Sequence, residues 1–456
     1  MRKLSTIIST ALLACALAAL APAAVAAPGD LDTRFGSGQG FLTTDVVPQN
    51  HDAANAVASD YLGRVWVAGT SFGTAASGGI AVTRYDSQGL DTSFASGGKR
   101  VIASGSDARG GDILERSNPV GPGLQVLIAG SVVEGGVRKP LVAAIQENGD
   151  LHPGWADDGL LSHPVPGASS TELTAIAEQA GRIVVAGHAT VNDKVYAFVA
   201  RYTARGELDP TFSSDGMRVM PAWRPYGAGT SVQSEAVIQD VVFDGSRNRI
   251  VLVGLDSRSG DVNALTIGLR STDGATDTSW GDRGLGRVFA FGHGNDWFNA
   301  AELAYNGKLV LAGGRDIPGT GKAAVTARLD TKGRLDLSYG GGNGVTRWHP
   351  GRDLDATDVA ITGAFIVVAT HDRGGTGGSA DDDTFTILRY RFNGDADLTW
   401  GPGNAEVRTN INPGTGGYER PNALAQRPDG TVAVAGIAAP GPTFLYQFAV
   451  AYYRSS

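Results

Sequence analysis

The sequence repeats one short motif seven times, and this repetition constrains the fold more than any other feature. The motif has a glycine, usually a leucine–aspartate pair, and an aromatic residue three positions after the aspartate. The aromatic positions are separated by 59, 61, 57, 68, 59 and 61 residues and are Phe35, Phe94, Trp155, Phe212, Trp280, Tyr339 and Trp400. A period of this length indicates a repeat architecture in which each unit is one supersecondary motif.

Two apolar runs recur once in every repeat, at the same spacing as the motif. One run is rich in β-branched residues and ends in a small residue, as in Val65-Trp66-Val67-Ala68-Gly69. The other ends in arginine and tyrosine, as in residues 198–202. Short runs of this kind bounded by Gly, Asp and Pro are strands, and two further runs bring each repeat to four strands. We therefore predict an all-β chain that forms a seven-bladed β-propeller with four antiparallel strands per blade.

The two ends of the chain predict how the ring closes. The chain opens with the aromatic motif and one strand, and it finishes on a strand of the arginine–tyrosine type with no motif after it. We expect residues 28 to 47 to complete the last blade beside residues 420 to 456, which leaves no open sheet edge. Residues 27–456 then form a single propeller domain.

The N-terminus has the order of a secretory signal peptide. Arg2 and Lys3 precede an apolar stretch, and a run of small residues ends at Ala26, so we expect residues 1–26 to be cleaved. The one cysteine, Cys15, lies inside this segment. The sequence Leu12-Leu13-Ala14-Cys15 loosely resembles a lipoprotein cleavage site, although apolar sequence continues beyond the cysteine. The mature chain then has neither disulfides nor thiol nucleophiles, and we expect a secreted or periplasmic bacterial protein.

The charge balance narrows the range of partners. Removing the signal peptide takes away two basic residues and no acid, so the net charge moves from −8 to −10. An acidic surface argues against nucleic acid and anionic membrane as partners. No later stretch is long and apolar enough to span a bilayer. We expect a monomer that is not an integral membrane protein.

The repeat resembles the delta-60 repeat family, a family of exported bacterial β-propellers of unknown function. Its best copy is Asn422-Ala423-Leu424-Ala425-Gln426-Arg427-Pro428-Asp429-Gly430-Thr431-Val432-Ala433-Val434-Ala435-Gly436. The resemblance covers residues 28 to 456. The second repeat departs from it at residues 117–123, and the fourth has extra residues around 221–234. The resemblance implies a fold and export, and it supplies no catalytic residues.

The expected strand order assigns each histidine to one of the two faces of the propeller. Within a blade, the loop after the second strand and the connection after the fourth strand lie on the same face. This places six of the seven histidines on one face and only His152 on the other. The six are His51, His163, His188, His293, His349 and His371.

Other polar and aromatic residues fall in the same loops. Aromatic, acidic and arginine side chains gathered on one face are typical of a small-molecule or carbohydrate surface. We therefore interpret a further set as candidate ligand-binding residues: Asp52, Trp223, Asp296, Trp297, Arg315, Trp348, Arg352, Asp372 and Tyr418. Glu419 and Arg420 belong to the same connections. The spacing Asp52-x-x-Asn55, which returns at Asp296 and Glu419, is equally explained by caps at the entry to the innermost strand.

Two classes of function remain open, besides a purely structural module without a ligand. The first is an exported binding module for a glycan, peptide or protein. The second is a hydrolase or lyase that acts on a polysaccharide or ester at the mouth of the channel. No serine-hydrolase, zinc-protease or phosphate-loop motif occurs. We predict no cofactor. The aspartates of the repeated motif suit turns better than metal sites, and the aromatic residue beside each of them is most simply a plug between blades. Asp381-Asp382-Asp383 leaves a divalent cation possible, although a solvated loop is the simpler explanation.

Overall fold

The protein is described by a computed structural model. The residues that it describes are 27–73, 78–102, 106–119, 121–226, 230–258, 261–281, 287–289, 291, 294–375, 383–412, 418–439 and 445–455. The segment predicted to be a signal peptide lies outside them. In the described ranges no helix has the length and apolar character needed to cross a membrane. Three short 3-10 turns interrupt the strands: η1 (Gly36–Gly38), η2 (Gly245–Arg247) and η3 (Gly340–Gly342).

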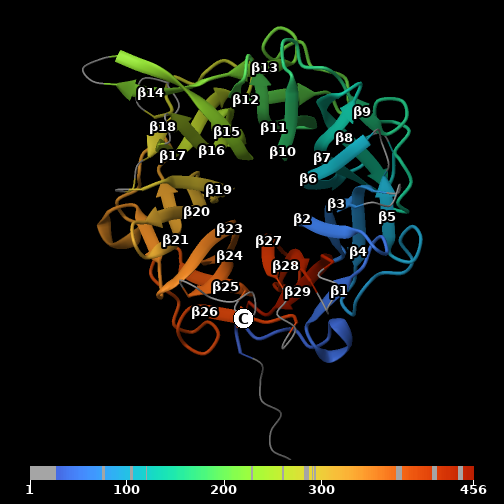
Figure 1. The fold of residues 1–456 in the computed structure, drawn as a ribbon, viewed down its shortest axis with the longest axis vertical. Coiled ribbons are helices and arrows are strands. Elements are labelled where there is room, and N and C mark those ends of the chain that lie inside the picture. Colours follow the sequence, from blue (N-terminus) through green and yellow to red (C-terminus); the bar gives the residue numbers. More distant parts are fainter. Residues whose placement is uncertain are drawn as a thin grey trace, which may run out of the picture.

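The chain forms a β-propeller, in which strands are arranged radially around a central axis (Figure 1). The apolar strands are buried on both faces against neighbouring sheets, which explains why they lack a clean alternation of polar and apolar residues. The innermost strands are β2 (His51–Ser59), β6 (Ser106–Ser117), β10 (Ser170–Gln179), β15 (Thr230–Asp244), β19 (Asp296–Leu303), β23 (Arg352–Thr362) and β27 (Glu419–Gln426).

Four of the sheets have four strands each. The first joins β2 to β3 (Val65–Phe72), β4 (Gly79–Tyr85) and β5 (Lys99–Ile102). The second joins β19 to β20 (Leu309–Ile317), β21 (Gly321–Leu329) and β22 (Val345–Trp348). The third joins β23 to β24 (Phe365–Gly375), β25 (Thr384–Arg391) and β26 (Glu406–Thr409). The fourth joins β27 to β28 (Val432–Ala438), β29 (Gln447–Tyr453) and β1 (Phe41–Thr44).

The remaining strands form two larger sheets. An eight-stranded sheet contains β6, β10, β7 (Leu124–Glu134), β8 (Val137–Gln146), β9 (Leu160–Ser162), β11 (Arg182–Val191), β12 (Lys194–Tyr202) and β13 (Met217–Met220). A five-stranded sheet contains β15, β14 (Ala222–Tyr226), β16 (Arg249–Arg258), β17 (Asp261–Arg270) and β18 (Arg287–Phe289).

The prediction of seven blades with four strands each is therefore wrong. The strands are joined in six sheets, and only four of these have four strands. Two physical causes account for the difference. A single parallel pairing of Ser170 with Arg138 joins β10 to β8, which merges the second and third repeats into one sheet. The extra residues of the fourth repeat fold back as β14 and add a fifth strand beside β15.

The ring is closed by hydrogen bonds between the two ends of the described chain. β1 runs antiparallel to β29, with Phe41 opposite Ala451 and Thr44 opposite Phe448. Leu31 forms a further bridge with Tyr453. Figure 1 shows the N-terminal strand in blue beside the C-terminal strands in red. This pairing covers the outer edge of the last sheet without a covalent link.

The repeated aromatic residues are the plugs between neighbouring sheets, as the sequence predicts. All seven are buried, with exposed fractions of at most 3%. The motif aspartates hold them in place through ion pairs. Asp209 accepts a hydrogen bond from Arg201, and the Arg201 guanidinium lies 4.9 Å from the centre of the Phe212 ring. Asp397, Arg389 and Trp400 repeat the arrangement. These aspartates are structural, which agrees with their interpretation as turn residues.

Candidate functional site

A β-bulge interrupts every innermost strand at the same level. In β2, for example, the pairing with β3 moves from Ala54 to Ala56, so Asn55 has no partner across the sheet. In six of the seven repeats a glycine lies opposite the bulge on the neighbouring strand, and a side chain on Gly69 would lie 1.9 Å from the Ala53 carbonyl oxygen. Thr370 occupies the same position in the sixth repeat, so the glycine that ends the Val-Ala-Gly run marks the bulge in most copies. A bulge of this kind redirects a side chain out of the pleat.

The bulged residues line a cavity on the axis, which we call the mouth cavity. It has a volume of about 250 Å³ and lies toward the face at which the innermost strands begin, which we call the entry face. Its lining residues are Asn55, Gly111, Thr174, Gln239, Asn299, Thr357, Arg420 and Asn422. All of them except Arg420 are the bulged residues themselves. The strand register thus gathers amide and hydroxyl groups around one point, although their identities vary from repeat to repeat.

Hydrogen bonds from four of these side chains, Asn55, Thr174, Asn299 and Asn422, tie an innermost strand to the next one. The Nδ2 atoms of Asn55 and Asn422 donate to the carbonyl oxygens of Gly110 and Ala54, both at 2.7 Å. Asn299 Nδ2 donates to the Ala356 carbonyl oxygen at 2.8 Å. Because each amide nitrogen faces a carbonyl oxygen, the orientation of the amide group is fixed by chemistry. The Oδ1 atoms of these asparagines remain as acceptors.

We call the seven bulged residues, Asn55, Gly111, Thr174, Gln239, Asn299, Thr357 and Asn422, the belt. Charged and aromatic side chains lie on the entry side of this belt. Trp297 Nε1 and Asn299 Nδ2 both donate to Asp355 Oδ1, at 2.9 and 3.2 Å. The indole packs over Gly314, where any side chain would clash with it, and Lys322 Nζ lies 4.8 Å from its centre. Trp297 was predicted as a ligand-binding residue, and the structure gives its ring a fixed orientation. Asp355 was not predicted.

A histidine–carboxylate pair lies elsewhere on the same side. His188 Nε2 is 3.5 Å from Glu172 Oε2, and the two residues are opposite each other across β10 and β11. Arg109 Nη1 donates to Glu172 Oε1 at 3.3 Å, and Arg138 Nε is 3.6 Å from the same oxygen. Hydrogen bonding and the charge of His188 hold the pKa of Glu172 below its ordinary value. His188 was predicted, whereas Glu172 was missed.

A band of aromatic rings crosses the entry face near the closure of the ring. His371, Tyr418, Tyr446, His51 and Phe72 follow one another with ring centres 5.5, 5.7, 5.0 and 5.4 Å apart. These residues come from β24, β2, β3 and the segments before β27 and β29. Three of the five, His51, His371 and Tyr418, were predicted. Burial lowers the pKa of His371, Asp383 opposes this shift, and the charge of Arg420 adds to it.

The acids at the starts of the innermost strands act as caps, which was the second interpretation of their spacing. Asp52 Oδ2 accepts from the backbone N–H groups of Val46 and Val47, at 2.7 and 3.1 Å. Asp296 Oδ2 accepts from Phe291 N, and Glu419 accepts from Ile411 N and Asn412 N. Arg315 lies beside Asp296 and donates to the Phe291 carbonyl oxygen. These groups hold the connections between sheets.

The histidines in those connections do not converge on one point. His51 Nδ1 accepts from Tyr446 N, His163 bonds the Tyr202 hydroxyl at 2.7 Å, and His349 contacts the Lys322 carbonyl oxygen. Burial lowers the pKa of His163. His293 lies outside the described residues, as does the side chain of Trp223 in β14. His152 is buried under the Gly154 N–H, which donates to its Nδ1.

The last group of predicted residues forms an ion-pair network rather than an open site. Asp372 Oδ2 is 2.7 Å from Arg352 Nη1 and 3.1 Å from Arg408 Nε. Glu406 accepts from Arg352 and also from Trp348 Nε1, the latter at 2.8 Å. Of the proposed cation site, Asp381 and Asp382 lie outside the described residues. Among the residues that are described, no group of three His, Cys, Asp or Glu side chains could hold a metal ion.

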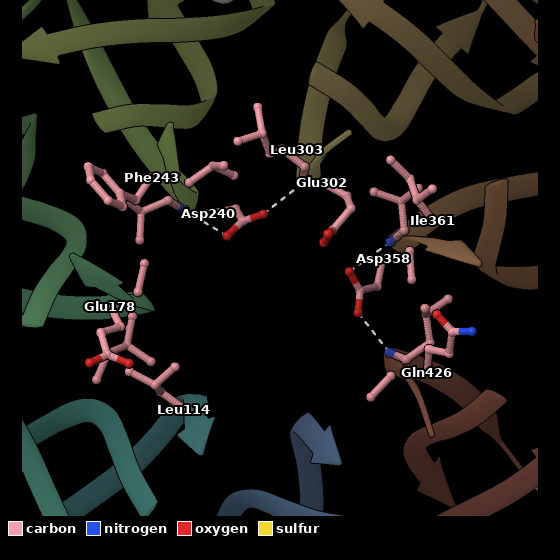
Figure 2. A pocket seen from close by; sticks show the side chains of 18 residues that line it. Leu114, Glu178, Asp240, Phe243, Glu302, Leu303, Asp358, Ile361 and Gln426 are labelled. Carbon is pink, nitrogen blue, oxygen red and sulfur yellow. Dashed lines mark hydrogen bonds between the residues drawn. The ribbon is translucent and has the colours of Figure 1, made fainter. Parts of the chain in front are cut away.

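A second, larger cavity of about 570 Å³ lies at the ends of the innermost strands (Figure 2). Its lining combines apolar side chains with four acidic residues, Glu178, Asp240, Glu302 and Asp358, and Glu302 projects into it. Removal from bulk water raises the pKa of Glu302 to about 7. A third cavity of about 130 Å³ is lined by residues of both of the others, among them Asn299 and Asp240.

Three aspartates at alternate repeats stand between the two larger cavities, one position after the bulge. Each bridges to a backbone N–H of the next innermost strand: Asp112 to Ile176, Asp240 to Ala301 and Asp358 to Leu424. Burial raises the pKa of Asp112 to about 6 and that of Asp358 to about 7. Burial and the charge of Asp112 raise the pKa of Asp240. Their role is to fasten neighbouring strands.

Comparisons with known proteins add the following similarities. No protein-family model matches the chain, and no curated protein matches it. A protein of unknown function from Dyadobacter fermentans DSM 18053 has 13% identity over 91% of this chain and 98% of its own, with a TM-score of 0.47. The polysaccharide lyase Uly1 has 9% identity over 91% of each chain and a TM-score of 0.46. Chaetomium thermophilum Sqt1 has 11% identity over 89% and 96%, with a TM-score of 0.40. Similarities this distant carry no information on function.

Proposed function

We propose that the chain is an exported binding propeller of the delta-60 repeat type that recognises a glycan at the entry face. The observation that carries this proposal is the belt of bulged side chains around the mouth cavity. The asparagines of the belt use their amide nitrogens within the protein, so their amide oxygens are left to accept hydrogen bonds. Sugar hydroxyls are donors of the matching kind.

The aromatic residues of the same face support this choice. Carbohydrate rings present apolar C–H faces as well as hydroxyl groups, and half-buried aromatic rings with polar edges suit such ligands. Trp297 and the part of the band from Tyr418 to Phe72 provide these rings on the same face, whereas His371 is buried. The mildly acidic net charge, −8 for the whole chain, does not favour nucleic acid as the ligand.

The proposal is tested with the mature protein, residues 27–456, on a panel of glycans followed by isothermal titration calorimetry. Trp297→Ala should weaken binding at least tenfold, which corresponds to about 1.4 kcal/mol. Tyr305→Ala is the matched control, because Tyr305 is an 88% exposed aromatic residue in the turn after β19, away from the entry face. The control should bind as the wild type does.

Two outcomes would contradict the proposal. One is the absence of any glycan ligand on the panel. The other is a glycan whose affinity changes with Tyr305→Ala but not with Trp297→Ala. Thermal unfolding of both variants, followed by circular dichroism, shows whether a loss of binding reflects a loss of folding.

A second candidate function, acid–base catalysis on a bound glycan, is favoured by the His188–Glu172 pair. A carboxylate that orients a histidine is a common arrangement for a general base. Because Nε2 of His188 faces Glu172, its solvent-shielded Nδ1 is the atom that would have to take a substrate proton. Arg109 and Arg138 lie beside the pair and are themselves paired with Asp107 and Glu172. Incubation of a bound polysaccharide with the protein should then release new reducing ends. His188→Gln should abolish that release and leave binding intact. An intact polysaccharide after prolonged incubation with the wild type would exclude this function for that ligand.

A further inference from the structure

Among the described residues, Arg420 is the only charged one that lines the mouth cavity. It precedes the bulge of β27 by two positions, and the remaining lining residues are neutral amides, hydroxyls and a glycine. The acids nearest to these residues, Asp355 and the aspartates that follow the bulges, accept hydrogen bonds within the protein, so Arg420 is the charged group left to a ligand. The cavity therefore favours an anionic group.

The guanidinium of Arg420 has no hydrogen-bond or ion-pair partner among the described residues, and its Nε atom is shielded from solvent. Other arginines of the entry face are paired, such as Arg109 with Glu172 and Arg352 with Asp372. The nearest acid along the chain is also occupied, because Glu419 accepts two backbone N–H groups. A partly buried guanidinium without a partner among the described residues is costly for the folded state, and it is available to a ligand group of opposite charge.

The asparagines of the belt determine which hydrogen-bonding groups the ligand must carry besides its anionic group. The Nδ2 atoms of Asn55, Asn299 and Asn422 donate to backbone carbonyl oxygens of the next strand, which leaves their Oδ1 atoms as acceptors. A matching ligand has several hydrogen-bond donors around one anionic group. A cavity of about 250 Å³ has the scale of a single sugar unit rather than of a longer chain segment.

We propose that Arg420 binds the carboxylate of an acidic sugar unit in the mouth cavity while the asparagine Oδ1 atoms accept from the hydroxyls of that unit. The proposal rests on the proposed function and defines its ligand class. The planar guanidinium matches a carboxylate with two parallel hydrogen bonds, a geometry that lysine cannot reproduce. A polysaccharide that contains uronic acid is then the preferred ligand, and its neutral counterpart is a weak one.

The test compares a uronic acid oligosaccharide with the same oligosaccharide after reduction of its carboxyl groups, both by calorimetry. The wild type should bind the acidic form at least tenfold more tightly, and its affinity should fall as salt is added. Arg420→Gln should bind the two forms equally and show little salt dependence, whereas Arg420→Lys should keep part of the preference. Arg334→Gln, at an exposed arginine in the turn before the sixth aromatic motif, is the matched control and should behave as the wild type.

The comparison of ligands and the salt series need no variant, so they decide the proposal even if Arg420→Gln folds poorly. Equal binding of the acidic and neutral forms to the wild type would overturn it, and so would a preference that survives in Arg420→Gln. A sulfated neutral sugar that binds as tightly as the uronate would overturn the carboxylate assignment. In each of these results the proposed glycan function stands. Failure to bind any glycan would instead refute the proposed function itself.

Discussion

Replacing Asp358 with asparagine should alter stability in a pH-dependent manner. Asp358 accepts one backbone N–H on each oxygen, from Val359 within its own strand and from Leu424 on the next strand, both at 2.7 Å. Burial raises its pKa to about 7, from an ordinary value of 3.8. The folded state therefore holds this proton more tightly than the unfolded state. The stability that the carboxyl contributes is fully present below about pH 4 and is lost as the pH rises through about 7.

The magnitude follows from these contacts. The rise of the pKa from 3.8 to about 7 corresponds to an upper limit of about 4 kcal/mol. The asparagine of the variant has only one acceptor oxygen and would leave one of the two N–H groups without an acceptor, at a cost of about 1–2 kcal/mol. Asp358→Asn should therefore be less stable than the wild type at pH 5. The difference should vanish or reverse by pH 8, where the wild type has an ionised buried carboxylate.

Urea unfolding of both proteins at pH 5, 6.5 and 8 measures this difference. Asp86→Asn is the matched control, because Asp86 is an exposed aspartate that also accepts two backbone N–H groups. Its effect should stay the same across the three pH values. A difference between Asp358→Asn and the wild type that is constant with pH, or that grows toward pH 8, would refute the reasoning.

Four further changes test other parts of the structure. Gly187→Ala would place a Cβ atom 1.9 Å from the Glu172 carbonyl oxygen and should lower the free energy of unfolding by about 3 kcal/mol, as urea unfolding would measure. Trp400→Ala removes a fully buried plug and should cost about 3–5 kcal/mol in the same assay. Deletion of residues 27–47 exposes the edge of β29, so size-exclusion chromatography should show aggregation. Arg420→Gln removes a guanidinium without a partner and should raise the thermal midpoint of unfolding or leave it unchanged.

The sequence predicts the repeat, the strands and the plugs because each of these is encoded locally. The aromatic residue lies three positions after an aspartate whose arginine partner ends the preceding strand, as Arg389, Asp397 and Trp400 illustrate. This unit recurs in most copies, although the third copy has His152 in place of the aspartate. The division of the strands into sheets could not be predicted in this way. A single bridge between Ser170 and Arg138 merges two repeats into one sheet, and no sequence pattern marks that bridge.

The candidate site was predicted only in part, for a similar reason. The expected strand order assigns His51, His188 and His371 to loops of one face, whereas the structure has His51 as the first residue of β2 and the other two within β11 and β24. The strand order does not reveal which side chains meet, because His51 binds a local backbone group whereas His188 reaches Glu172 across the sheet. The bulged residues differ in identity from copy to copy, so no repeat marks them. Their signal is indirect and lies in the glycine opposite the bulge, such as Gly69, which six of the seven repeats carry.

The central claim is that ligand binds at the mouth cavity of the entry face rather than at the larger cavity near Glu302. Hydrogen–deuterium exchange of the mature protein, with and without a saturating uronic acid oligosaccharide, tests it most directly. Bound ligand should protect the starts of β2, β19 and β27, which contain Asn55, Asn299 and Asn422, and leave the ends of β15 and β19 unchanged. Protection centred on Phe243 and Glu302 instead would contradict the claim.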